Sequence, residues 1–373
     1  MEIKGINYVG PIFDLSGYGQ AARGYVLALN KLGIPITIHK PVSFEEGFSN
    51  FGENGDILVG LIDKKIDYNI NIIHLTPEHW KLFIEPGKFN IGYSVWETDK
   101  LHSEWPKYIN STVNACMVSC DWNTEVYKRS GVKVPVYDVP HGIDMSEFDD
   151  IIPYEVSGIN PKAYKFYSIF QFIERKNPMA LIKSYWHAFQ NNENVALIMK
   201  TYRMGFSNEE KQVIKDAVMH MKKLMPMDKY PPIYLVGDML DRSEVLGLHK
   251  FGDCCVSLDR GEGFGLVPFE AGACGNPIIV TGMGGVLEYA KPDNSYLVNY
   301  TMTPVFGMPQ SPWYRGDQKW AEPDLEDAAA TMRFVYENKQ ESKDRGIKLK
   351  QYISDNLTWE KVSGRMLEVI KSI

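Results

Sequence analysis

A strand-like segment, a glycine-rich turn and the start of a helix follow one another in the last third of this chain. Cys254–Leu258 is a short apolar run typical of a buried strand, and Gly261, Gly263 and Gly265 punctuate the turn that follows it. After Pro268 the apolar spacing predicts a short helix. This order places backbone N–H groups and the positive end of a helix dipole where an anion binds. The segment therefore predicts a phosphate site on an α/β scaffold.

Two glutamates belong to the same segment. Glu262 lies in the turn, and Glu270 lies about one helical turn into the predicted helix. Both carboxylates are expected to face one ligand while the turn amides hold its phosphates. A nucleotide with a sugar attached is one ligand that needs both.

The pair Glu262 and Glu270, with seven residues between them, and the downstream runs 271–280 and 284–288 resemble the signature of the family 4 glycosyltransferases. The resemblance extends over about twenty-five positions in order, which makes it specific. It implies a retaining enzyme of the GT-B fold, in which two doubly wound Rossmann-like α/β domains face a cleft.

The resemblance also implies roles for individual residues. Glu270 falls on the glutamate that binds the nucleotide ribose, and Glu262 falls on the one near the hydroxyls of the donor sugar. The amides of the turn are expected to meet the diphosphate and the sugar, and they belong to Gly263, Phe264, Gly265 and Leu266.

Arg175 and Lys176 precede a helix predicted from Pro178 to Gln190. By the resemblance, Lys176 falls on a lysine that neutralises the donor diphosphate, and Gln171 stands where the family has an arginine. We expect Arg175 to supply the missing charge from the adjacent position, because its planar fork suits two phosphate oxygens. A cation is needed here, since stabilising a leaving diphosphate accounts for much of the rate of such an enzyme.

The chain alternates short apolar strands with helical stretches in two successive series, which is typical of parallel sheets with crossover helices. A length of 373 residues also favours two domains. We predict an N-terminal acceptor-side Rossmann-like domain at 1–145 and a C-terminal nucleotide-sugar-binding Rossmann-like domain at 146–356. By the resemblance, a helix at 357–373 crosses back to the first domain. Ligands are expected in the cleft between the two domains.

Gly17 and Gly19 form the pattern G-x-G-x-x-A ahead of a helix predicted from Gln20 to Leu32. As a dinucleotide fingerprint the pattern predicts an oxidoreductase. However, it lies well beyond the first strand, and the second strand runs into Lys40 without an acidic residue to bind a ribose. By the resemblance, Gly17 and Gly19 instead form a loop across the cleft from the donor, where the backbone approaches the phosphates.

Trp96 and Glu97 follow a strand predicted from Asn90 to Val95, where many members of the family place a histidine close to the sugar. An aromatic ring beside a carboxylate suits a sugar-like or planar acceptor, and Glu97 is predicted to orient the acceptor hydroxyl. The proline-rich and aromatic region 300–324 has no clear period. We expect it to pack over the sheet, with a partner or acceptor contact as the alternative.

Composition narrows the remaining choices. A formal net charge of −7 argues weakly against a polyanionic partner, although it leaves a nucleic acid acceptor open. The five cysteines form no Cys-x-x-Cys pair, and no Asp-x-Asp triplet stands at a strand end, so no metal and no cofactor are predicted. The sequence has no apolar run that spans a bilayer and no signal peptide at its start, so a cytoplasmic location is expected.

Together these features predict a hexosyl- or pentosyltransferase that moves a sugar from a nucleotide diphosphate sugar to an acceptor hydroxyl with retention. The acceptor classes left open are a glycan, a lipid, a small molecule, a protein and a modified nucleic acid base. Two other classes also stay open: a nucleotide-dependent Rossmann oxidoreductase and a non-catalytic nucleotide-sugar-binding protein.

Overall fold

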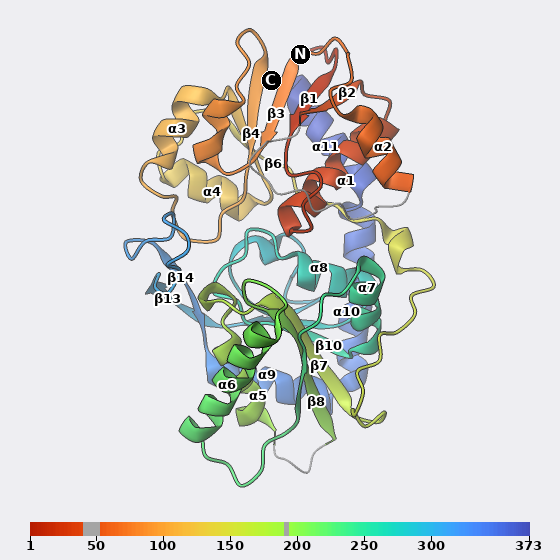
Figure 1. Ribbon diagram of the computed structural model, residues 1–373, viewed down its shortest axis with the longest axis vertical. Helices are drawn as coiled ribbons and strands as arrows, with labels where there is room; N and C mark the ends of the chain where they lie inside the picture. The colour runs from red at the N-terminus through yellow and green to blue at the C-terminus, as the bar shows by residue number, and fades with distance from the viewer. Residues whose placement is uncertain (40–52, 190–193) are drawn as a thin grey trace. The chain divides into compact units, whose positions relative to one another are not determined.

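The computed structural model describes residues 1–39, 53–189 and 194–373. The chain divides into two compact units, one made of Met1–Asp144 and Asp355–Ile373 and the other of Met145–Ser354. Each unit has a six-stranded sheet with helices against it (Figure 1). The predicted α/β alternation in both halves is therefore confirmed. Lys40 and Gln190, which end a predicted strand and a predicted helix, lie outside the described residues.

The sheet of the first unit has the order β2-β1-β3-β4-β5-β6, and every neighbouring pair is parallel. Its strands are β1 (Ile6–Val9), β2 (Ile36–His39), β3 (Ile70–His74), β4 (Phe89–Tyr93), β5 (Ala115–Val118) and β6 (Val136–Asp138). The helices of this unit are α1 (Gly17–Lys31), α2 (Glu53–Leu61), α3 (Trp105–Thr112), α4 (Asp121–Arg129) and α11 (Trp359–Ser372), with a 3-10 turn at Pro77–Leu82. The central strands are buried along their length, as a parallel sheet covered on both faces requires.

Helix α1 begins at Gly17 and not at Gln20. Ser16 caps it, because its Oγ accepts the Gly19 N–H at 3.4 Å. Gly17 and Gly19 therefore lie in the first helical turn, and the prediction that they form a loop is wrong. A methyl group on Gly19 would lie 2.0 Å from the carbonyl oxygen of Asp14, so the close approach of the preceding loop requires glycine there.

The C-terminal helix α11 packs against α1 within the first unit. Thr358 caps α11, and the ring of Trp359 lies against Gly24, where a methyl group would come within 2.0 Å of it. Tyr25 of α1 meets the same ring edge-on, at 5.1 Å between centroids. These contacts join the end of the chain to its beginning.

The sheet of the second unit has the order β12-β11-β10-β7-β8-β9 and is also parallel throughout. Its strands are β7 (Tyr164–Gln171), β8 (Val195–Tyr202), β9 (Ile233–Val236), β10 (Cys254–Ser257), β11 (Ile278–Thr281) and β12 (Tyr296–Val298). Its helices are α5 (Pro178–Ala188), α6 (Asn208–Leu224), α7 (Arg242–Phe251), α8 (Leu266–Cys274), α9 (Leu325–Glu337) and α10 (Lys339–Asn356), with 3-10 turns at Met145–Phe148, Glu174–Lys176 and Gly284–Glu288. The core of this unit lies between the sheet and the helices α5 and α9, around Phe166, Trp186 and Phe189.

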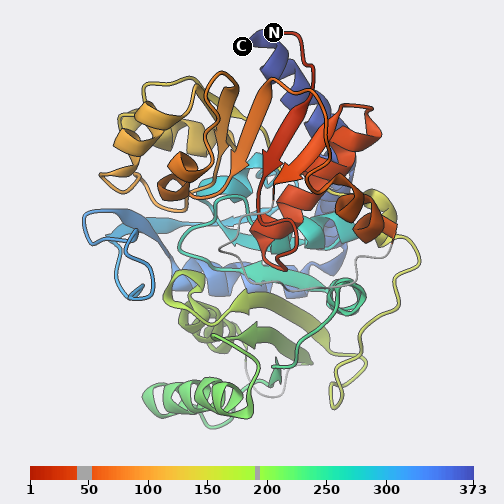
Figure 2. The same ribbon diagram turned by 45° about the horizontal axis from the view of Figure 1, so that its top comes forward.

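The region 300–324 contains a separate antiparallel pair, β13 (Tyr300–Pro304) with β14 (Lys319–Pro323). Figure 2 shows this pair as a blue ribbon that extends from the six-stranded sheet. Val305, Met308 and Trp320 form a small core of their own beneath it. The two strands were not predicted, because their residues do not alternate regularly between apolar and polar; β13 is mostly exposed, whereas most of β14 is buried.

Candidate functional site

The loops that carry the predicted donor site leave the second sheet at its topological switch point. From β7 the chain moves to β8 on one side, and β10 pairs with β7 on the other side. The segments after β7 and after β10 therefore start from adjacent carboxyl ends, where open parallel sheets bind their ligands. Arg175 and Lys176 lie in the first segment, and Glu262 lies in the second. The two segments are joined directly, since the Arg260 N–H donates to the Arg175 carbonyl at 2.8 Å.

The glycine-rich turn packs closely against two further glycines, Gly284 and Gly285. The N–H of Gly285 donates to the Glu262 carbonyl at 2.7 Å, and a methyl group on Gly285 would lie 2.1 Å from the Gly263 carbonyl oxygen. Gly265 has a φ of 83°, which only glycine adopts readily, and α8 begins at the next residue. The contact of Gly285 with Gly263 and the conformation of Gly265 therefore shape the turn that leads into the N-terminus of α8.

Of the four predicted turn residues, Phe264 contributes a buried side chain. It is 3% exposed, and its ring centroid lies 5.0 Å from that of Phe269 and 5.4 Å from that of Tyr289. The Tyr289 hydroxyl donates to the Gly265 carbonyl at 2.5 Å. The three rings therefore pack against the turn and support it. The backbone amides of the turn, and not the Phe264 side chain, are the groups suited to a phosphate.

Both predicted cations contact Glu262. Arg175 Nη1 lies 3.2 Å from Glu262 Oε1 and also donates to the Gly261 carbonyl at 2.7 Å. Lys176 Nζ forms an ion pair with the same Oε1 and lies 3.8 Å from Asp259 Oδ2. The side chains of Arg175, Lys176 and Glu262 are 12 to 18% exposed, so they keep limited access to solvent. The structure brings these three residues into one charged cluster.

Asp259 belongs to this cluster and was not predicted. Its Oδ2 accepts a hydrogen bond from the Ser257 hydroxyl, and only 8% of the residue is exposed. Burial raises the pKa of Asp259 to about 7, with Glu262 adding to the rise and Lys176 opposing it. Burial also disfavours the charged form of Glu262, but the attraction of Lys176 and Arg175 outweighs burial and lowers the pKa of that carboxyl. The cluster thus contains one carboxylate held ionised and one carboxyl that holds a proton near neutral pH.

The β13–β14 pair supports the loop that carries the cations. Arg260 Nε donates to Glu322 Oε2 in β14 at 2.6 Å, and its Nη1 donates to Glu174 Oε1 at 2.5 Å. The Arg260 guanidinium also lies 5.4 Å from the ring centroid of Trp320. The region 300–324 therefore connects to Glu174, the residue next to Arg175. No sequence period indicated this contact, because it joins side chains far apart in the chain.

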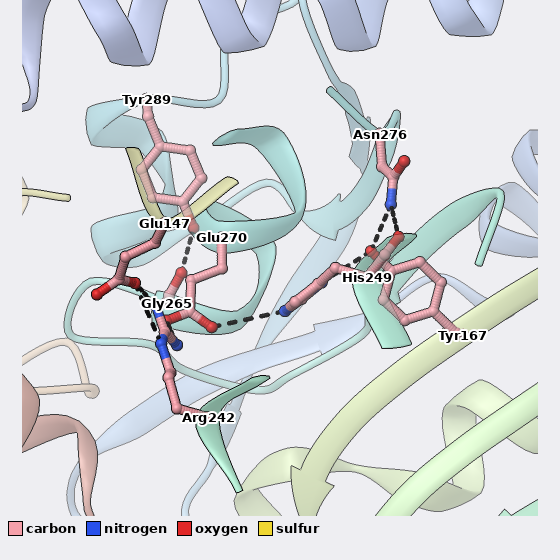
Figure 3. Close-up of polar contacts among 8 residues, drawn as sticks. All are labelled: Glu147, Tyr167, Arg242, His249, Gly265, Glu270, Asn276 and Tyr289. Carbon is pink, nitrogen blue, oxygen red and sulfur yellow. Dashed lines mark hydrogen bonds and ion pairs between the residues drawn. The ribbon is translucent and has the colours of Figure 1, made fainter. Parts of the chain in front are cut away.

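Glu270 lies in α8 with a side chain that is 5% exposed (Figure 3). Arg242, the first residue of α7, donates from Nη1 to Glu270 Oε1 at 2.5 Å and from Nη2 to Glu147 Oε2 at 2.6 Å. His249 of the same helix places Nε2 3.5 Å from Glu270 Oε2. Neither Arg242 nor His249 was predicted. Their spacing of seven residues on α7 puts both side chains on one helical face. This spacing could not identify a site from the sequence, because nothing there shows that the face packs against Glu270.

Gln171 stands where the family has an arginine, and its side chain has a different role. Its Nε2 donates to the Arg203 carbonyl at 2.7 Å, which uses the side chain to join the ends of β7 and β8. The positive charge beside Glu262 accordingly comes from Arg175 and Lys176.

Gly17, Gly19 and Glu97 belong to the first unit. The hydroxyl of Tyr18, between the two glycines, lies 2.9 Å from Ser94 Oγ and accepts the Val95 N–H at 3.2 Å. The start of α1 is thereby joined to the segment that leads from β4 to Glu97. The structure brings these predicted residues together within the unit.

Trp96 does not present its ring to an acceptor. Strand β4 ends at Tyr93, so Trp96 and Glu97 lie in the following loop. Trp96 is 3% exposed, and its Nε1 donates to Thr98 Oγ1 at 2.7 Å and to the Lys100 carbonyl at 2.9 Å. Its ring packs edge-on against Trp105, at 4.5 Å between centroids. The expectation that Trp96 suits a planar acceptor is wrong, because burial and these hydrogen bonds turn it into the core.

A family model matches the part of the chain that contains the glycine-rich turn. Residues 233–301, which include Glu262 and Glu270, match the family described as glycosyl transferases group 1. With the GT-B architecture, this match confirms the resemblance at the level of group 1 glycosyltransferases, while the assignment to family 4 stays a prediction.

Solved structures show the same fold over nearly the whole chain. Sucrose-phosphate synthase from Thermosynechococcus elongatus is 14% identical, with a TM-score of 0.69 and coverage of 99% of this chain and 98% of that one. HepE from Anabaena, in complex with UDP and glucose, is 11% identical, with a TM-score of 0.66 and coverage of 99% and 100%. The E. coli trehalose-6-phosphate structure bound with UDP-2-fluoro glucose is 11% identical, with a TM-score of 0.68 and coverage of 99% of both chains. These likenesses confirm the GT-B fold.

A curated relative comes from Sulfolobus islandicus rod-shaped virus 1 and is named uncharacterized protein 356. It is 22% identical over an alignment of 253 residues, and the alignment covers 61% of this chain and 64% of the relative. The match thus spans less than two thirds of that relative's length.

None of the helices in residues 1–39, 53–189 and 194–373 is long and apolar enough to cross a membrane. Within the same ranges, no three His, Cys, Asp or Glu side chains are grouped to hold a metal ion.

Proposed function

We propose that this protein transfers a sugar from a nucleotide diphosphate sugar to an acceptor hydroxyl, with retention at the anomeric carbon. The observation that carries the proposal is the convergence of Arg175 and Lys176 on Glu262 at the carboxyl edge of the second sheet, beside the N-terminus of α8. Two similar structures, HepE from Anabaena and the E. coli one, hold UDP or a UDP sugar, which supports a donor of this class.

The proposed donor site uses each group for a separate part of the ligand. The amides of Gly263, Gly265 and their neighbours meet the diphosphate at the helix N-terminus. Lys176 and Arg175 exchange their ion pair with Glu262 for the phosphate oxygens, which accept charge-assisted hydrogen bonds. Glu262 then turns to the hydroxyls of the donor sugar, and Glu270 accepts the hydroxyls of the ribose.

The proposed reaction needs no protein nucleophile. The bond between the anomeric carbon and the leaving phosphate oxygen breaks, and the acceptor oxygen bonds to that carbon on the same face. The acceptor's proton passes to the leaving diphosphate. Lys176 and Arg175 stabilise the charge that develops on this diphosphate, so the proposal includes no metal ion.

For the acceptor we propose a contribution from the first unit. Glu97 lies in the loop that Tyr18 connects to the start of α1, and its carboxylate is proposed to orient the acceptor hydroxyl. Gly17 and Gly19 are proposed to bring backbone close to the donor. Both lie in the first turn of α1, where the Gly19 N–H donates to the Ser16 cap, so the N–H of Gly17 is the one proposed to meet the ligand.

Release of free nucleoside diphosphate from a panel of nucleotide sugars tests the proposal. The parent protein is expected to release it, and Lys176→Ala is expected to lower turnover by about a hundredfold or more. Lys183→Ala, which changes an exposed lysine on α5, is the matched control and should leave turnover unchanged.

Three results would contradict the proposal. Equal turnover in Lys176→Ala and the parent would remove the assigned role of the cation. Donor binding without turnover across a broad acceptor panel would favour a non-catalytic binding protein. Thermal stabilisation by NAD and by none of the nucleotide sugars would favour an oxidoreductase.

A further inference from the structure

Glu270 is approached by a basic side chain at each of its two oxygens (Figure 3). Arg242 donates to Oε1, and His249 Nε2 lies 3.5 Å from Oε2. Arg242 is 39% exposed and is shared with Glu147, whereas His249 is fully buried. A buried imidazole beside a buried carboxylate calls for a physical reason, because its polar atoms are removed from water.

The hydrogen bonds around His249 determine which ring nitrogen carries the proton. Asn276 Nδ2 lies 2.6 Å from the His249 carbonyl oxygen and 2.8 Å from the Tyr167 hydroxyl. A carbonyl oxygen only accepts, so the Asn276 atom beside it is the amide nitrogen, and its second N–H points to Tyr167. The Tyr167 oxygen therefore accepts from Asn276, and its own proton is directed elsewhere.

That proton is directed to His249 Nδ1, which lies 2.9 Å from the Tyr167 oxygen. The Cys255 thiol also interacts with this hydroxyl, but sulfur is a weaker acceptor than an imidazole nitrogen. Because Nδ1 accepts, the ring proton resides on Nε2, which faces Glu270 Oε2. Among the described residues, Nε2 makes no hydrogen bond, and its separation of 3.5 Å from Glu270 Oε2 is longer than an ordinary one. Such catalytic or binding contacts are often long in the absence of ligand and shorten when it binds.

We propose that His249 is a positioning residue that holds the Glu270 carboxylate for the donor ribose by donating from Nε2–H to Oε2. This proposal rests on the function proposed above, in which Glu270 accepts the ribose hydroxyls. Arg242 donates to Oε1, and in the proposed arrangement His249 donates to Oε2, so that each oxygen of the carboxylate is directed by a different side chain. The hydrogen bonds from Asn276 to Tyr167 and from Tyr167 to His249 direct the Nε2–H toward Glu270, as the hydrogen-bond partners of metal-bound histidines orient those rings.

Calorimetric titration with nucleoside diphosphates tests the inference. The parent protein is titrated with UDP, ADP and GDP, and the tightest binder is then compared with its 2′-deoxy and 3′-deoxy forms. His249→Phe fills the same space without an N–H and is expected to weaken binding of the ribonucleotide about tenfold. His249→Gln, whose amide places an N–H near the same point, is expected to recover most of this loss.

The deoxy forms separate positioning from a structural role. With the form that lacks the hydroxyl held by Glu270, His249→Phe and the parent are expected to bind equally. Equal weakening for all three ligands, or no weakening for any, overturns the inference. If no nucleoside diphosphate binds the parent, the proposed function fails, and the inference fails with it.

Tyr167→Phe provides a second variant that keeps the ring in place if His249→Phe does not fold. It removes the group that holds the proton off Nδ1, so it is expected to weaken ribonucleotide binding in the same direction, by about threefold. Affinity equal to that of the parent overturns the assignment of the proton to Nε2.

Discussion

Asp259→Asn is expected to remove a pH-dependent loss of stability. Asp259 is 8% exposed and accepts a hydrogen bond from Ser257, while the nearest cation, Lys176, pairs with Glu262. Burial and the neighbouring Glu262 raise the pKa of Asp259 from 3.8 to about 7. The folded protein therefore binds more protons at this site than the unfolded chain does between these two pH values. Stability consequently falls as pH rises through that window.

The size of the effect follows from the shift in pKa. Each unit corresponds to about 1.4 kcal/mol, so the whole window amounts to about 4 kcal/mol, of which about 2.5 kcal/mol falls between about pH 5 and 8. Glu262 has a lowered pKa and stays ionised across this range, so it adds nothing to the difference. The asparagine amide does not titrate. It also fills the same space and keeps the contact with Ser257.

Urea unfolding of both proteins at several pH values between about 5 and 8 measures this difference. The free energy of unfolding of the parent should fall relative to that of Asp259→Asn as pH rises. Ser257→Ala removes a hydrogen bond that favours the ionised carboxyl, so it should move the midpoint of the fall to higher pH. A difference between Asp259→Asn and the parent that stays constant with pH would refute the reasoning.

Three further outcomes are expected. Gly285→Ala places a methyl group 2.1 Å from the Gly263 carbonyl oxygen, so it should destabilise the protein by about 1 to 3 kcal/mol and weaken donor binding. Gly205→Ala, which meets no atom within 4 Å, is its control in urea unfolding and calorimetry, and equal effects of the two would contradict the packing argument. Trp96→Phe loses two hydrogen bonds and should lower the free energy of unfolding by about 1 to 3 kcal/mol in urea; an unchanged value would argue against its buried role. Treatment with EDTA should leave turnover intact, because the proposed charge comes from side chains, and a loss restored by Mg²⁺ would count against this.

Some features of the site were accessible from the sequence because they depend on neighbours along the chain. A strand followed by glycines and a helix start is a local pattern, so the turn around Glu262 and the start of a helix after it could be predicted. Arg175 and Lys176 could be predicted because they lie just before a helix, and aligning that helix with the family placed Lys176 on the family's lysine. The boundaries were less accurate, because Ser16 caps α1 and the helix begins at Gly17, whereas the sequence predicted a start at Gln20.

Other features depend on contacts between distant segments. Asp259 looks like any turn aspartate until the fold buries it beside Glu262, and Trp96 looks like an exposed aromatic until it packs on Trp105. The partners of Glu270 come from α7, and they become visible only when α7 and α8 lie side by side.

The sequence by itself determined the class of fold and the location of a glycine-rich turn at a helix N-terminus, because helix and strand periods and glycine conformations depend on a few neighbouring residues. The tertiary structure decided which charges are paired and which groups hold a proton. Those properties depend on burial and on distances of a few ångströms between side chains far apart in sequence, as for Lys176 with Glu262 and His249 with Glu270.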